Sequence, residues 1–301
     1  MKKKWFVALS FSVLFYACAK DNNTKAPIAQ APKVPIKVSV ADFVKKVEHL
    51  PAPLGRQASS TTTLAKDSTA NISDIYLSIF NRYGERVNFI HQKSTEGNFG
   101  IFSDSLPAGS YSIAAVAATD SLIIDYGISL NVDAQGDSIL SPFPDIFYKK
   151  ISIVVGTDTA ANNFNLSLER LMACLEVNII DAPAADSNVA VKMRYESSSY
   201  YIPGDTYSGQ MTMSLKIPRR GQQIFNELIM NTSGEIEVDI SYPDRNTNAI
   251  LTKTIRHVML SKNTKTVLTG NLYTTPTVDE FNSGFRITIN SIWNPSETIP
   301  F

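Results

Sequence analysis

The sequence predicts an all-β protein with two tandem β-sandwich domains that follow a signal peptide and a flexible tether. From residue 74 onward, apolar and polar residues alternate in short runs, and turns rich in Gly, Pro and Asn separate these runs. A period of two is typical of β-strands. No segment after residue 70 keeps a helical period over three turns. The alternation starts again near residue 158, so we expect sandwiches at residues 71–157 and 158–301.

The first predicted sandwich opens with the alternating residues 75–80, which end in an Asn-Arg-Tyr-Gly turn. Pro107 pre-sets the backbone of a second turn, and Gly109 supplies a conformation that other residues adopt poorly. Tyr111 then begins a half-buried strand. The remaining runs lie at residues 87–91, 99–102, 122–132 and 145–155. Several short strands at this spacing are the signature of a sandwich.

The second predicted sandwich repeats the pattern at greater length. One segment differs, because residues 222–230 favour a short helix. The strand-like runs lie at residues 163–168, 171–180, 189–195, 211–217, 236–242, 251–260, 266–273 and 285–293.

The first eighteen residues predict export. Lys2, Lys3 and Lys4 precede an apolar run at residues 5–16 that only two serines interrupt. As a helix this run would rise roughly 18 Å, well short of the roughly 30 Å hydrocarbon core of a bilayer. A cleaved signal peptide at residues 1–17 therefore fits better than a transmembrane anchor.

The end of the apolar run resembles a bacterial lipobox. Leu14, Phe15, Tyr16 and Ala17 precede Cys18, with Phe15 where Leu is more usual. The alternative is an ordinary secretory signal with an incidental cysteine. Two or three acyl chains on Cys18 would anchor the chain stably, because each buried CH₂ contributes about 0.8 kcal/mol.

Behind the cysteine, Lys20 and Asp21 resemble the export signal that sends lipoproteins of the Bacteroidota to the cell surface. The pair can equally be part of a solvated tether. We expect an outer-membrane lipoprotein that faces outward.

Residues 18–70 are predicted to form a tether, because prolines recur among Ala, Lys, Ser and Thr. Two pieces of it can be ordered. Residues 36–40 alternate like a short strand, and residues 41–50 can form a small helix.

Composition argues against several function classes. The mature chain has three more acidic than basic residues, so nothing suggests nucleic acid as a partner. Once Cys18 is acylated, Cys174 has no cysteine to pair with and is expected to be a buried small hydrophobe. His49, His91 and His257 lie far apart without metal-ligand spacing. No nucleophile elbow or phosphate-binding glycine pattern is present. We therefore expect no enzyme and no cofactor.

Five segments in order resemble the fimbrillin superfamily, the subunits of Bacteroidota type V pili, and above all its minor and anchor subunits. One is Leu-Pro-Ala-Gly-Ser-Tyr at residues 106–111, and another is Leu-Glu-Arg-Leu at 168–171. The others are residues 75–84, 145–148 and 265–273, the last ending in Gly-Asn-Leu-Tyr.

The resemblance implies two transthyretin-like sandwiches that assemble with other fimbrial subunits by donor-strand exchange, which uses the unpaired edge of a sheet. In shaft subunits an arginine-specific protease removes an N-terminal strand. Here residues 36–40 would be that strand and Arg56 the processing site, or Arg56 is simply an arginine in a tether. An anchor subunit would keep its N-terminus and its lipid.

A tyrosine cluster supports a second hypothesis, a surface adhesin or carbohydrate-binding lipoprotein. Tyr200, Tyr201 and Tyr207 surround a loop, and exposed tyrosines can stack on sugars or bind protein partners. The alternative is that they are half-buried strand residues.

Overall fold

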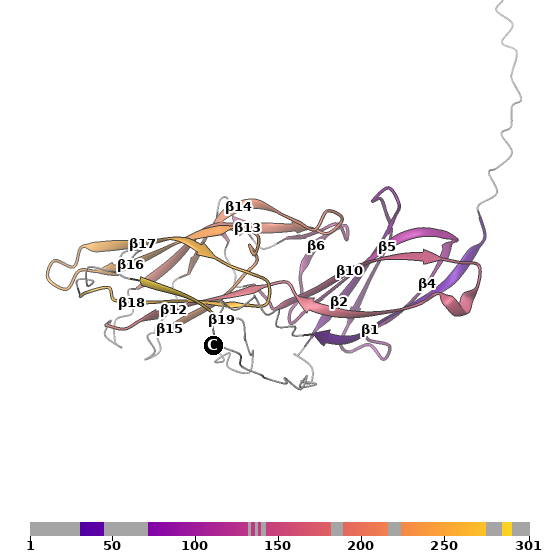
Figure 1. Cartoon of the computed structure of the whole chain (residues 1–301), viewed down its shortest axis with the longest axis horizontal. Helices are drawn as coiled ribbons and strands as arrows, with labels where there is room; N and C mark the ends of the chain where they lie inside the picture. The colour runs from indigo at the N-terminus through magenta and orange to yellow at the C-terminus, as the bar shows by residue number, and fades with distance from the viewer. Residues whose placement is uncertain are drawn as a thin grey trace, which may run out of the picture.

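The computed structural model describes residues 31–44, 72–131, 134–135, 138–139, 143–181, 189–215, 224–274 and 285–290. Within these ranges the regular secondary structure is almost entirely β-strand, with one short 3-10 helix, η1 (Thr159–Ala161). The strands form two sandwiches that lie one after the other along the long axis of the molecule (Figure 1). The all-β prediction is confirmed.

The first sandwich is a seven-stranded sheet that folds over on itself. Strands β10 and β11 pair only at Phe147–Tyr148 with Glu169–Arg170 and then diverge, so that the sheet splits into two facing layers. One layer has the order β3 (Arg86–Lys93), β2 (Asp74–Asn81), β5 (Gly109–Ala118) and β10 (Ile146–Val155). The other has the order β11 (Asn163–Arg170), β1 (Lys33–Val44) and β4 (Ile101–Pro107).

The core of this sandwich lies between the two layers. Every second residue of each strand points inward, as the period of two requires. Leu77, Ile113 and Phe147 from the first layer meet Val38 and Leu168 from the second, and all five are nearly or fully buried.

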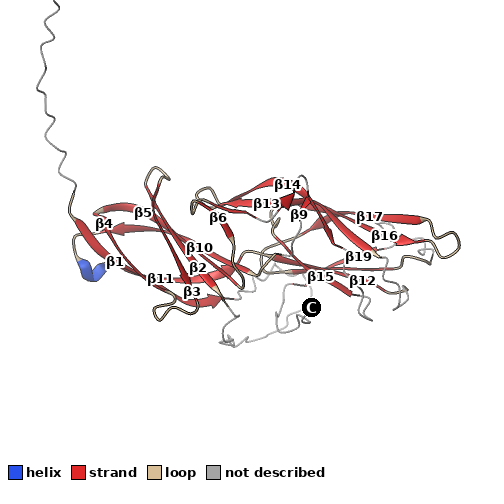
Figure 2. Ribbon diagram, turned by 180° about the vertical axis from the view of Figure 1, so that it is seen from behind, coloured by secondary structure: helices blue, strands red, loops and turns tan. Residues whose placement is uncertain are grey.

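The second sandwich also has two sheets. The smaller has the order β15 (Ile224–Ile229), β12 (Ala173–Ile179), β18 (Lys265–Gly270) and β19 (Phe285–Asn290). The larger contains β17 (Ile250–Met259), β16 (Glu235–Pro243), β13 (Ala190–Tyr201) and β14 (Thr206–Leu215), and continues to β9 (Ser138–Ile139) and β8 (Ala134–Gln135). Two further short strands, β6 (Ile123–Asp125) and β7 (Ser129–Asn131), join it through β13 (Figure 2).

The core of the second sandwich extends onto the outer face of the first. Tyr76, Phe80 and Val116 point away from the first core and belong to the same buried cluster as Met193 and Ile240 of the second sandwich. Strand β2 is therefore buried on both faces. The domains are coupled by apolar packing, and the segment between β5 and β10 also reaches across from the first sandwich to pair β7 with β13.

The exchange of strands between domains differs from the boundary expected between residues 157 and 158. Strand β11 lies after that point but pairs with β1 and β10 in the first sandwich. Strands β6 to β9 lie before it but join the larger sheet of the second sandwich. Sequence order alone does not reveal such crossovers, because each strand needs only an edge to pair with.

Two helix predictions are wrong in their described parts. The strand expected at residues 36–40 is present but continues to Val44, so residues 41–44 are not helical, and residues 45–50 lie outside the described residues. Residues 224–229 form strand β15, which pairs antiparallel with β12 along its whole length. Phe225, Glu227 and Ile229 alternate inward there, because the partner strand fixes the backbone as extended.

Candidate functional site

The first strand, β1, lies in the middle of its layer although it comes first in the chain. It pairs parallel with β11 from Lys37 to Val44 and antiparallel with β4 from Lys33 to Ser39. Backbone hydrogen bonds hold it on both sides: Lys37 N donates to Asn162 O at 2.9 Å, and Val40 N donates to Gly100 O at 2.8 Å. Without β1, strands β4 and β11 would each have an unpaired edge.

Alternate side chains of β1 complete the core of the first sandwich. Ile36 and Val38 are 4% and 1% exposed, and Val34 and Val40 pack against the same cluster. Burying a side chain of this size contributes about 1.5–3 kcal/mol, so the two most buried residues are substantial contributors to the stability of this domain. The strand therefore fills a groove whose floor is apolar and whose walls are backbone edges.

Several residues singled out in the sequence cannot be placed. Cys18, Lys20, Asp21, His49 and Arg56 lie outside the described residues. Arg56 follows β1 and precedes β2, so it belongs to the segment that joins this groove-filling strand to the rest of the domain.

A buried arginine joins the first sandwich to the second. The Arg170 side chain, at the end of β11, is fully buried and forms a double hydrogen bond to Asp145, with its Nε and Nη2 2.8 Å from the two carboxylate oxygens. Its Nη1 donates to Asn263 Oδ1 at 2.9 Å, in the turn between β17 and β18. The sequence marked this arginine only as part of a family-like segment, and nothing in the pattern indicated its partners.

The tyrosine cluster is mainly structural. Tyr200 is completely buried and packs edge-on against Tyr148 and Tyr207, with ring centroids 5.3 and 5.0 Å apart. Its ring therefore has no free face for a ligand, and the prediction for Tyr200 is wrong. Tyr207 is partly buried, and its hydroxyl bonds Thr232. Of these three tyrosines, only Tyr201, at 42%, is exposed enough to contact a partner.

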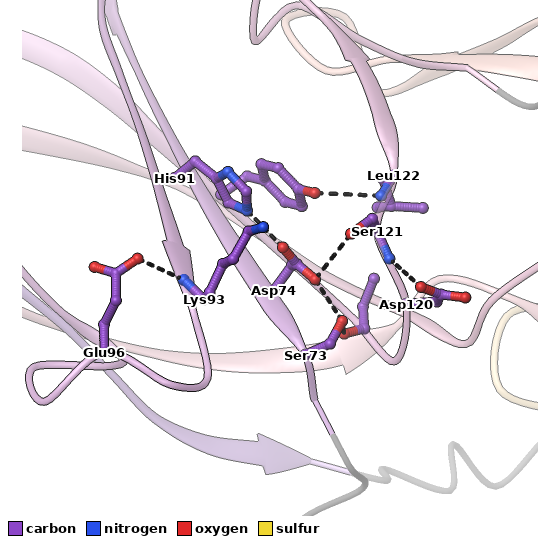
Figure 3. Close-up of polar contacts among 10 residues, drawn as sticks. Ser73, Asp74, His91, Lys93, Glu96, Asp120, Ser121 and Leu122 are labelled. Carbon is purple, nitrogen blue, oxygen red and sulfur yellow. Dashed lines mark hydrogen bonds and ion pairs between the residues drawn. The ribbon is translucent and has the colours of Figure 1, made fainter.

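His91 forms a polar cluster with Asp74 and its neighbours (Figure 3). His91 Nε2 lies 2.6 Å from Asp74 Oδ1, and the imidazole stacks on Tyr76 with ring centroids 4.3 Å apart. The hydroxyl groups of Ser73 and Ser121 donate to the Asp74 carboxylate. Burial alone would raise the pKa of Asp74, but the hydrogen bonds from Ser73 and His91 outweigh it and lower the pKa.

This cluster is not arranged like a hydrolytic triad. In a triad the nucleophile hydroxyl contacts the histidine, whereas here both serines contact the carboxylate. Within the described part of the chain, no group of three or more His, Cys, Asp or Glu side chains could hold a metal ion.

Two buried glutamates lie inside the second sandwich. Glu196 of β13 is fully buried; its Oε1 accepts hydrogen bonds from the backbone N–H groups of Ser197 and Asn231, both at 2.7 Å. Its Oε2 has no hydrogen-bond partner. Burial raises the pKa of Glu196 to about 7. Burial, with a smaller contribution from the Glu196 charge, raises the pKa of Glu227 to about 8. No pattern in the sequence pointed to these two glutamates.

Cys174 is buried, as the sequence predicted, and its thiol is free. Burial raises the pKa of its thiol to about 12. Among the described residues no helix has the length and apolar character needed to cross a membrane.

Two tandem sandwiches, the first of them with a central N-terminal strand, define a two-domain β-sandwich protein. The sequence profile of one family, described as the fimbrillin-A associated anchor proteins Mfa1 and Mfa2, matches residues 59–294. The chain belongs to this family, and the resemblance drawn from the sequence is confirmed.

Solved structures agree with the fold. The fimbrial anchor protein Mfa2 from Porphyromonas gingivalis is similar over 87% of this chain and 98% of its own, with 11% identity and a TM-score of 0.51. A candidate polysaccharide-binding protein from Bacteroides thetaiotaomicron covers 79% of this chain and 92% of its own, with 11% identity and a TM-score of 0.55. A candidate adhesin from Bacteroides ovatus has 12% identity, coverages of 86% and 93%, and a TM-score of 0.50. No curated protein matches the chain.

Proposed function

We propose that this chain is a lipid-anchored minor or anchor subunit of a surface fimbria, which attaches the fimbria to the outer membrane and assembles by strand exchange without catalysis. The observation that carries this proposal is the position of β1, a strand that is N-terminal in sequence but central in its layer and paired on both sides. Its partners would be other fimbrial subunits.

Attachment would come from Cys18. Acyl chains on this residue would hold the chain on the membrane, and Lys20 and Asp21 would direct it to the outer surface. Because β1 begins only at Lys33, a short segment would separate the lipid from the first strand of the folded body.

Strand exchange would use the groove that β1 fills. A donor strand from another subunit would need apolar side chains at alternate positions, matching Ile36 and Val38, and would regain the backbone pairing with β4 and β11. Cleavage at Arg56 would cut the covalent connection between β1 and β2. In an anchor subunit Arg56 would stay intact and β1 would remain in place, so this groove would accept a donor strand only in a chain cleaved at Arg56.

Intact mass and N-terminal mapping of the protein from native outer membranes test the proposal. A chain that begins at a diacylglyceryl Cys18 and is intact at Arg56 is the expected result. A chain that begins at Gln57 and carries no lipid would replace the anchor role with that of a polymerising subunit. An unlipidated chain cut elsewhere would refute the membrane attachment. A Cys18→Ser variant is the control, because it should be recovered unlipidated.

The groove itself is tested with a chain that has been cleaved between β1 and β2. A labelled peptide of residues 33–44 is then added to it. We expect the peptide to replace the resident β1 slowly and to stay bound. A matched peptide with Ile36→Ser and Val38→Ser should fail to enter. Equal uptake of both peptides would contradict side-chain-directed exchange.

A further inference from the structure

The direction of β1 determines how it would carry a pulling force. Strand β1 starts at the end of the first sandwich that is remote from the second, and it runs toward the second sandwich (Figure 1). It is parallel to β11 over seven residue pairs. Strand β11 in turn leads through Leu171 and Met172 directly into β12 of the second sandwich.

We propose that β1 and β11 form a mechanical clamp that carries axial load between an N-terminal attachment and the second sandwich. A force that pulls Lys33 outward meets its counterforce at the C-terminal end of β11. Two parallel strands pulled from these opposite ends must slide past each other along their length.

A β-ladder resists force best when its two strands are pulled along their length, so that they must slide past each other. In shear, all hydrogen bonds between two strands share the load and must break together, whereas a force across the ladder opens them one pair at a time. Strand β4 adds a second ladder of seven residue pairs on the other side of β1, and this ladder also lies along the direction of pull. The clamp therefore has two ladders in shear around one strand.

Two further features strengthen the clamp: the buried side chains of β1 and the contacts of Arg170 at the C-terminal end of β11. Ile36 and Val38 project into the core, so β1 cannot slide without dragging buried side chains past their neighbours. At the other end, Arg170 closes β11 with its double hydrogen bond to Asp145 and its bond to Asn263. Load leaving β11 thus reaches the second sandwich through the chain and through a buried polar contact.

This inference takes only the direction of load from the proposed attachment at Cys18. The clamp can be measured on the isolated chain, and absence of lipid on Cys18 in cells would refute the attachment without touching the measured mechanics.

Single-molecule force spectroscopy with two pairs of handles tests the clamp. The protein for this experiment begins at residue 18 and carries Cys18→Ser. Both pairs of handles share one attachment point, at Ala31→Cys. The buried Cys174 is left in place. A second handle at Asn246→Cys, in the β16–β17 turn of the second sandwich, loads β1 in shear. A second handle at Ala108→Cys, beside the Lys33–Pro107 pair, instead opens the β1–β4 ladder from its end.

We expect β1 to detach at a several-fold higher force in the shear direction. Its release is recognised by its length, because residues 33–73 give roughly 140 Å of extended chain at about 3.4 Å per residue. Equal rupture forces in the two directions would overturn the proposal. The proposal would also be overturned if, in the shear direction, β1 detached before any other unfolding event and at the same force as in the opening direction.

A matched pair of variants separates mechanical from thermodynamic effects. Val38 of β1 and Val155 of β10 are both 1% exposed and lie in the same buried cluster. Val38→Ala and Val155→Ala should lower the denaturant midpoint by similar amounts. Only Val38→Ala should lower the shear rupture force by more than the general loss of stability explains, because only Val38 lies on the loaded strand. Equal rupture forces for the two variants would contradict the clamp.

Discussion

The buried carboxyl group of Glu196 should make the protein less stable as the pH rises. Its folded-state pKa is about 7 because of burial, against the ordinary pKa of 4.5 for a glutamate side chain. Between these two pH values the unfolded chain releases the proton while the folded chain keeps it. Rising pH therefore favours unfolding across this window, and above about pH 7 the loss is complete. A difference of about 2.5 pKa units corresponds to about 3 kcal/mol.

The variant Glu196→Gln removes this titration and keeps most of the structure. The amide oxygen can still accept the backbone N–H groups of Ser197 and Asn231. The amide NH₂ would replace an oxygen that has no partner, which costs about 1–3 kcal/mol at every pH. The informative quantity is therefore the change in unfolding free energy between pH 5 and pH 8, not its absolute value.

Urea unfolding followed by circular dichroism at pH 5 and pH 8 measures this change. The variant should lose about 2 kcal/mol less than the parent protein between the two pH values, because the unfolded carboxyl is already partly ionised at pH 5. Glu227, whose pKa is about 8, leaves a residual dependence of the same sign. Glu169→Gln is the control, since this carboxylate is half exposed in a surface pair with Lys149. An unchanged difference in Glu196→Gln would refute the reasoning.

Three further predictions concern other buried groups. Arg170→Leu should lower the unfolding free energy by about 3–5 kcal/mol in urea titrations, because it leaves the Asp145 carboxylate without its partner; a loss under 1 kcal/mol would contradict this. Asp74 has a lowered pKa, so its stabilisation is present above the unfolded pKa and is lost as the pH falls through the lower folded value. Asp74→Asn should therefore show a weaker loss of thermal stability on acidification below pH 4, and an identical acid profile would count against it. The Cys174 thiol, with a pKa of about 12, should react with a thiol reagent at pH 8 only after unfolding, whereas rapid labelling of the folded chain would contradict its burial.

The fold class could be predicted because alternation is a local property. Strands β2, β5 and β16 follow runs whose period of two was visible in the sequence, and even the short run at residues 36–40 marked β1 correctly. The helix expected at residues 222–230 failed because Glu227 and Asn226 weaken the local strand signal, and pairing with β12 overrides it.

The candidate site was only partly predictable. The sequence marked residues 36–40 as a strand in a tether, and its resemblance to fimbrillins suggested a removable strand. It did not show the parallel pairing with β11, because that pairing joins segments more than a hundred residues apart in the chain. The burial of Tyr200 was hidden for a related reason, since alternation does not tell which face of a strand meets a second domain.

By itself, the sequence determined that the chain is all-β, that it forms two sandwiches, and that it resembles the fimbrial family to which it belongs. These depend on periodicity, turn chemistry and short motifs, all of which act over a few residues. Only the tertiary structure decided that β1 lies between β4 and β11, that the domains exchange strands, and that Glu196 and Arg170 are buried. Each of those depends on which distant edges and faces meet, because hydrogen-bond partners and desolvation are properties of the assembled core.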